Sequence, residues 1–114
     1  MDLTDKQQQQ QNGQLRPPKI KEHPISMVVK KHDPTQLECK ADGNPKPIIE
    51  WYKDNVKIEQ SSSHPIIMAD GETLFFLHVN TRKGEHSDTG IYYCLARNEV
   101  GKARSNNATL DVAN

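Results

Sequence analysis

The pair of cysteines, with the aromatic residues placed between and beside them, constrains this sequence most. Cys39 and Cys94 are its only thiols, and each lies in a run of alternating apolar and polar residues typical of a strand. Trp51 lies on a third such run between them, and Tyr92 stands two residues before Cys94, the placement of a tyrosine corner. A disulfide here would close a loop of about 55 residues and contribute about 4 kcal/mol to stability. The alternative is two unpaired buried thiols in a cytosolic domain.

Length and composition restrict the protein further. With 114 residues and 12.9 kDa, the chain suits one domain. Lys and Arg together number 15, as do Asp and Glu, so no net positive charge supports nucleic-acid binding. Apolar residues make up 33%, which predicts a small core or a partly unfolded chain. The longest apolar run is only a few residues, so we expect neither a membrane span nor direct membrane contact.

The first residues of the sequence are more polar than the rest. Gln7 to Gln11 and the polar residues around them bury almost nothing, so we expect a disordered leader over residues 1–16 and a folded domain over 17–114. No apolar segment of a secretion signal is present near the N-terminus. The cellular compartment therefore has to be inferred from the cysteines.

From residue 20 onward, short period-two runs alternate with turn signals, and no long stretch has helical period. This pattern predicts an all-β sandwich. Gly, Pro, Asn or Asp occurs in each break between runs. A further short edge piece at 20–23 ends at Pro24. The expected strands span residues 25–30, 35–41, 48–53, 64–69, 73–80, 90–97 and 102–112.

The same residues carry a resemblance to a known family. The two cysteines, Trp51, the run Asp88-x-Gly90-x-Tyr92-x-Cys94 and the turn Asn98-x-x-Gly101 resemble an immunoglobulin domain of the I-set type. The resemblance implies an immunoglobulin-like β-sandwich of two antiparallel sheets with Greek-key connections. More selective segments, including the Glu-His-Pro run before the first strand pattern and the Leu-Phe-Phe-Leu strand, resemble the first immunoglobulin domain of the Roundabout (Robo) receptors. These segments span 20–24, 37–45, 49–53, 74–77, 96–101 and 105–110.

Alternation along the strands predicts which side chains face outward. Leu37 shares the inward face of Cys39, so Glu38 and Lys40 are expected to point out. In the I-set pattern Leu74 and Phe76 enter the core. Phe75 and Leu77 then face solvent on the strand beside that of Cys39, together with at least one of Ile66, Ile67 and Met68.

Such an apolar patch with charged neighbours usually marks a partner site, although a following domain of the same receptor could also cover it. The resemblance implies that the partner is Slit, bound through a leucine-rich-repeat domain. Phe75 and Leu77 would be apolar anchors, and Glu22 and Lys40 would set the register by charge. The implied Slit-binding positions are Glu22, Glu38, Lys40, Ile66, Phe75 and Leu77, with Met68 nearby.

Basic residues gather at one end once the topology is assumed. Lys30 and Lys31 precede the Cys39 strand, and Arg82 and Lys83 follow the Phe75 strand, so a Greek key brings the two turns together. Four cations suit an acidic polysaccharide through charge pairing that salt weakens. The resemblance implies heparan sulfate at Lys31, Arg82 and Lys83, but His78 stands where some relatives have a basic residue. Solvated turn lysines are the plain alternative.

Two other functions stay open. Outward residues of the opposite sheet could support homophilic adhesion, or the domain could be a structural repeat of an intracellular muscle-type protein. The first predicts self-association, and the second predicts reduced thiols and no glycan. The adhesion residues would be Tyr52, Ile91, Tyr93 and Leu95.

No catalytic, metal or cofactor motif stands out. The five histidines lack metal-ligand spacing, and a set of Ser63, His64 and Asp88 is expected to be split over separate turns without an oxyanion element. We therefore expect no enzyme activity and no cofactor. Asn107-Ala108-Thr109 is an N-glycosylation sequon whose asparagine points outward. It supports an extracellular location, and the resemblance implies that the domain is part of a plasma-membrane receptor.

Overall fold

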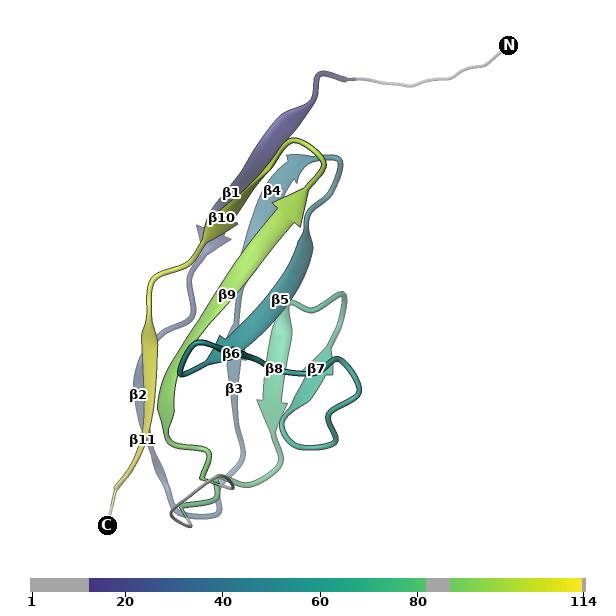
Figure 1. Ribbon diagram of the computed structural model, residues 1–114. Coiled ribbons are helices and arrows are strands. Elements are labelled where there is room, and N and C mark those ends of the chain that lie inside the picture. Colours follow the sequence, from purple (N-terminus) through teal and green to yellow (C-terminus); the bar gives the residue numbers. More distant parts are fainter. Residues whose placement is uncertain (1–12, 82–86, 114) are drawn as a thin grey trace.

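The computed structural model describes residues 13–81 and 87–113, and in these ranges every regular element is a strand (Figure 1). No helix in the described part is long and apolar enough to cross a membrane. The all-β prediction is confirmed. The strands are β1 (Arg16–Glu22), β2 (Met27–Lys30), β3 (Thr35–Glu38), β4 (Lys40–Asn44), β5 (Ile48–Lys53), β6 (Val56–Lys57), β7 (Ile66–Met68), β8 (Thr73–Phe76), β9 (Gly90–Asn98), β10 (Gly101–Arg104) and β11 (Ala108–Ala113).

The strands form two packed layers, and the first strand region is divided between them. One layer has the order β2-β11-β9-β5-β6, with β10 also paired to β9, and the other contains β3-β8-β7. β1 pairs with β4, whereas β2 pairs with β11 in parallel. The prediction of wholly antiparallel sheets was therefore wrong at this pair. Buried Pro24 lies between β1 and β2 and has no N–H for a ladder, which explains why pairing changes there.

β1 is longer than the short edge piece expected from the sequence. It begins at Arg16, one residue before the predicted domain boundary. Asn44 Nδ2 donates to the Gln14 carbonyl at 2.7 Å, and Asn98 Nδ2 donates to the Arg16 carbonyl at 2.9 Å. Side-chain amides thus hold a segment whose prolines suit an edge strand. Residues 1–12 of the predicted leader lie outside the described residues.

Several predicted strands are shorter or broken. The run 35–41 is divided at Cys39, whose N–H instead donates to the Glu72 carbonyl at 2.8 Å. The run 73–80 ends as a strand at Phe76. The run 102–112 is interrupted at Ser105, which accepts a hydrogen bond from the Cys94 N–H at 2.9 Å. Elsewhere, Pro65 and the positive φ of Ala69 confine β7 to three residues.

The core lies between the layers around the Cys39–Cys94 disulfide, which confirms the predicted pairing. Fully buried Trp51 donates from Nε1 to the Gly71 carbonyl at 2.6 Å. A Cβ at Gly71 would lie 2.7 Å from the Ile49 carbonyl oxygen, so this turn requires glycine. The Tyr92 hydroxyl donates to the Asp88 carbonyl at 2.6 Å, forming the tyrosine corner. Burial raises the pKa of this hydroxyl far above its usual range, so it remains a donor.

Candidate functional site

The outer surface of the β3-β8-β7 layer, here called the open face, contains most of the predicted Slit positions. Phe75 on β8 lies opposite Gln36 on one side and Ile66 on the other. One step along, Thr73 lies opposite Glu38 and Met68 in the same manner. The register therefore brings into one surface residues that are far apart in the sequence. The open face consists of Gln36, Glu38, Ile66, Met68, Thr73 and Phe75.

Apolar side chains on and beside the open face remain exposed in the described part of the chain. Ile66 is 38% exposed, Met68 46% and Leu77 63%. The Phe75 side chain lies on the outward side of β8, as expected. It was expected to face solvent, but it is partly buried, because Gln36 and Ile66 flank it. Leu77 lies just beyond the end of β8 and extends the apolar part toward the turn that follows.

The other end of this surface is charged. Glu22 and Lys40 lie opposite each other where β1 pairs with β4, and their Oε2 and Nζ atoms are 3.9 Å apart. Glu38 accepts a hydrogen bond from Gln36 Nε2. Both members of the Glu22–Lys40 pair are about half exposed, so the pair contributes little to stability. A partner can therefore compete for these charges at low cost.

A hollow of about 240 Å³ adjoins the charged end. Ile25, which lines the hollow, is 74% exposed, and sequence reasoning missed it. It follows buried Pro24 at the point where the chain changes layers, a change that only the strand pairing shows. The hollow is lined by Glu22, His23, Ile25, Met27, Gln36, Leu37 and Glu38.

The outer surface of β5, β9 and β10, here called the stacked face, is organised differently. The Tyr52 and Tyr93 rings stack with centroids 5.0 Å apart at an interplanar angle of 4°. The Arg104 guanidinium covers Tyr93, with Cζ 3.8 Å from the ring centroid. Tyr52, Tyr93 and Leu95 are thus partly buried, and Ile91 is left as the most accessible of the four predicted adhesion residues. The stacked face consists of Glu50, Tyr52, Ile91, Tyr93, Leu95, Arg97 and Arg104.

An ion-pair network completes the stacked face. Glu50 Oε2 lies 3.1 Å from Arg97 Nη2 and 3.2 Å from Lys57 Nζ. The hydrogen bond from Arg97, supported by that from Lys57, lowers the pKa of Glu50 below its usual range despite partial burial. The charges of this face are therefore largely satisfied within the chain.

The basic end is only partly described. Lys30 and Lys31 are exposed, and the neighbouring His32 N–H donates to the Val79 carbonyl at 3.4 Å. This hydrogen bond brings the lysine turn against the segment that leads toward residue 82. Arg82 and Lys83 lie outside the described residues.

The structure adds a contact that the sequence did not predict. His64 and Asp88 lie on separate loops, as expected, yet His64 Nε2 lies 2.8 Å from Asp88 Oδ2. Long-range packing brings them together, because Asp88 Oδ2 also accepts the Asn80 N–H at 2.7 Å. His78, the departure from the basic pattern, stacks on His64 with centroids 5.1 Å apart. Ser63 is exposed, and in the described part of the chain no hydrogen bond joins it to His64, so the set does not form a catalytic relay.

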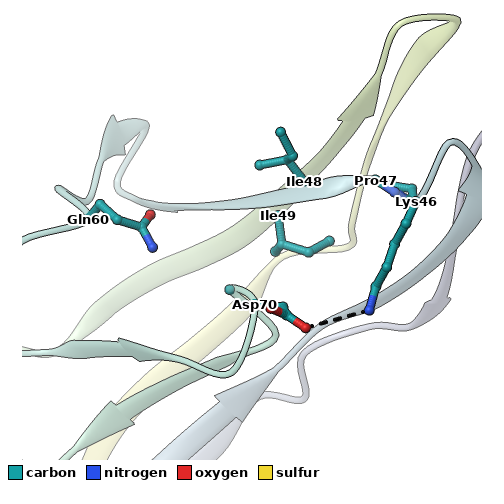
Figure 2. A pocket seen from close by; sticks show the side chains of 7 residues that line it. Lys46, Pro47, Ile48, Ile49, Gln60 and Asp70 are labelled. Carbon is teal, nitrogen blue, oxygen red and sulfur yellow. Dashed lines mark ion pairs between the residues drawn. The ribbon is translucent and has the colours of Figure 1, made fainter.

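A larger hollow of about 440 Å³ lies beside the first half of β5 (Figure 2). Lys46 and Asp70 form an exposed ion pair of 3.6 Å across it, and Ile49 lies on its wall. None of the predicted site residues lines it. Within the described ranges, no group of three or more His, Cys, Asp or Glu residues is placed to hold a metal ion.

Residues 18–112 match the immunoglobulin I-set domain family, so the chain belongs to that family. Roundabout homolog 2 of Homo sapiens is 46% identical over 101 residues, which cover 85% of this chain and 7% of that protein. Protein sax-3 of Caenorhabditis elegans is 44% identical over 101 residues, covering 84% of this chain and 8% of that protein. These similarities support an immunoglobulin domain of the Roundabout type, and the chain spans less than a tenth of these relatives.

A solved structure supports the same fold. A chimeric titin Z1Z2 functionalized with a KLER exogenous peptide from decorin gives a TM-score of 0.75 at 28% identity and covers 88% of this chain and 98% of that one. Identity to the Roundabout relatives is considerably higher than to this titin chain. Both the fold and these receptor relatives are non-enzymatic, and the chain is not an enzyme.

Proposed function

We propose that this chain is the Slit-binding module of a Roundabout-type receptor and that it works outside the cell. The observation that carries the proposal is the uncovered apolar surface at Ile66, Met68 and Leu77 around the partly buried ring of Phe75. These residues are also the positions that the family resemblance implies for Slit. Two independent arguments, one from strand alternation and one from resemblance, therefore support the same surface.

The arrangement suits an oriented protein contact. Apolar residues occupy one end of the surface, and the Glu22–Lys40 pair occupies the other. Burying Phe75 and Leu77 against the concave side of a leucine-rich-repeat domain would supply most of the affinity. The exposed charges would contribute mainly to orientation and association rate.

Binding to Slit is tested by titrating a Slit leucine-rich-repeat fragment against the domain and its Phe75→Ala variant. We expect the dissociation constant to rise at least tenfold, as for an interface anchor. Ile91→Ala is the matched control, because it removes an accessible apolar side chain from the stacked face and should leave affinity unchanged. Unchanged affinity in a folded Phe75→Ala variant would refute the assignment.

We also propose that heparan sulfate binds at the basic end. Lys30 and Lys31 are exposed there, and the hydrogen bond from His32 to Val79 holds their turn against the described segment that ends at residue 81. Changing Arg82 and Lys83 to alanine should lower the salt concentration that elutes the domain from immobilised heparin. A variant with Lys19 and Lys21 changed to alanine loses the same charge from β1 and should elute close to wild type. Equal elution of both double variants would remove the claim.

Homophilic adhesion is less well supported, because Tyr52 and Tyr93 already stack on each other under Arg104. It predicts dimers in sedimentation experiments, whereas the Slit proposal predicts a monomer in the absence of ligand. A structural intracellular repeat predicts reduced thiols. The mass under non-reducing conditions should instead be that of the disulfide form, consistent with the Cys39–Cys94 bond.

A further inference from the structure

The sequon asparagine lies at the border of a small hollow on the stacked face. The hollow measures about 200 Å³ and lies between β9, the β5–β6 turn and the segment after β10. Asn107 is itself part of the lining, so a group attached to its side chain starts inside the rim. The lining residues are Asp54, Asn55, Ile91, Tyr93, Arg104 and Asn107.

Arg104 fixes the orientation of the Asn107 amide. Its guanidinium lies over the Tyr93 ring at 3.8 Å, and the far side of that ring is stacked on Tyr52. From this position Arg104 Nη2 donates to Asn107 Oδ1 at 2.9 Å. This hydrogen bond uses the amide oxygen and does not occupy the amide nitrogen. An N-linked sugar is attached at that nitrogen.

The walls of the hollow suit a sugar ring. Ile91, 45% exposed, supplies an apolar surface for the ring carbons. Asn55 and Arg104 provide polar groups for hydroxyl and acetamido groups. The opposite wall is a tight turn with positive φ at Asp54 and Asn55, and Asp54 Oδ1 accepts the Ile91 N–H at 3.0 Å. This wall is therefore held in place before any sugar arrives.

We propose that Asn107 carries an N-linked glycan whose first N-acetylglucosamine packs in this hollow, over Ile91 and against Arg104. In the attachment step, the Asn107 amide nitrogen bonds to C1 of the sugar of a polyprenyl-diphosphate oligosaccharide. The bond from C1 to the diphosphate oxygen breaks, the diphosphate leaves with the electron pair, and the amide loses one proton. The packed sugar then covers the accessible apolar residue of the stacked face, which restricts protein partners to the open face.

The inference rests on the extracellular location in the proposed function but not on Slit binding, so the two can fail separately. The test is secretion from glycosylating cells, followed by endoglycosidase trimming to a single N-acetylglucosamine. Nuclear Overhauser effects should connect the sugar's acetyl methyl group with the Ile91 methyl groups. Arg104→Ala keeps the sequon and should lose these effects, because it removes both the hydrogen bond to Asn107 and one wall of the hollow.

Stability provides a second measurement. Thr109→Ser keeps a sequon, whereas Thr109→Ala abolishes it and leaves the bond between Asn107 and Arg104 in place. The trimmed Thr109→Ser protein should melt about 2–4 °C above Thr109→Ala, and bacterial preparations of the two variants should differ much less. An unmodified Asn107 in the secreted protein, or a mobile sugar without contacts to Ile91, would overturn the proposal.

Discussion

The two outer faces of this sandwich follow the same alternation of inward and outward residues. On one face the aromatic side chains pack against each other, and on the other face apolar side chains stay exposed. On the stacked face, Tyr52 and Tyr93 lie opposite each other, so their rings meet and Arg104 covers the pair. On the open face, Phe75 lies between Gln36 and Ile66, neither of which is aromatic. The difference arises from which residue types the register places opposite each other.

This comparison shows why the apolar content of a strand is a poor guide to function by itself. Ile91, Tyr93 and Leu95 form as apolar an outward series as Phe75 and Leu77. Most of the first series is covered within the chain, whereas Leu77, Met68 and Ile66 are not. The uncovered surface is the one available to a protein partner.

The largest expected difference between the faces is the loss of stability when one aromatic ring is removed from each, Tyr93 from the stacked face and Phe75 from the open face. Tyr93→Ala should lower the free energy of unfolding by about 2–3 kcal/mol, because it removes buried area, the Tyr52 stack and the Arg104 contact. Phe75→Ala should cost about 1 kcal/mol, since Phe75 is also partly buried but no ring contact to it occurs among the described residues. Urea unfolding of both variants measures this. Equal losses would show that the faces do not differ in internal packing.

Sequence reasoning predicted those parts of the molecule that depend on alternation and on the disulfide. Cys39, Trp51 and Tyr92 are buried as expected, because each belongs to a strand with a clear inward phase. The outward placement of Glu38 and Lys40 follows from the same phase, and these are two of the seven predicted Slit positions.

The parts that could not be predicted depend on contacts between distant segments. Arg104 has the pattern of an ordinary outward residue. The β9–β10 register places it opposite Leu95, and only the side-chain geometry shows that its guanidinium covers Tyr93. His64 and Asp88 meet across loops that have no periodicity. β1 has little apolar pattern that could have predicted it. Side-chain amides of Asn44 and Asn98 hold this segment through its backbone carbonyls.

A smaller effect is expected from the charges of the stacked face. The pKa of Glu50 is lowered from its ordinary value of 4.5, chiefly by Arg97. A lowered folded-state pKa contributes stability above the unfolded pKa, and this contribution is lost as the pH falls through the folded value. Glu50→Gln should therefore be less stable than wild type by at most about 1 kcal/mol at neutral pH.

The pH dependence identifies the cause of that loss. The difference between wild type and Glu50→Gln should disappear as the pH is lowered below 4.5 and the wild-type carboxylate becomes protonated. Adding Arg97→Ala to Glu50→Gln should produce little further loss if the two residues act as a pair. A difference that persists at low pH would mean that the glutamine disturbs packing rather than charge.

The smallest effect is expected at Leu77, and its absence is informative. Leu77 is 63% exposed and lies beyond the end of β8, so Leu77→Ser should change the free energy of unfolding by less than about 0.5 kcal/mol. Urea midpoints for the isolated domain provide the measurement. A loss well above 1 kcal/mol would mean that this chain covers Leu77 in solution. The apolar surface around Phe75 would then be covered by the chain itself, and the physical case for a protein partner there would fail.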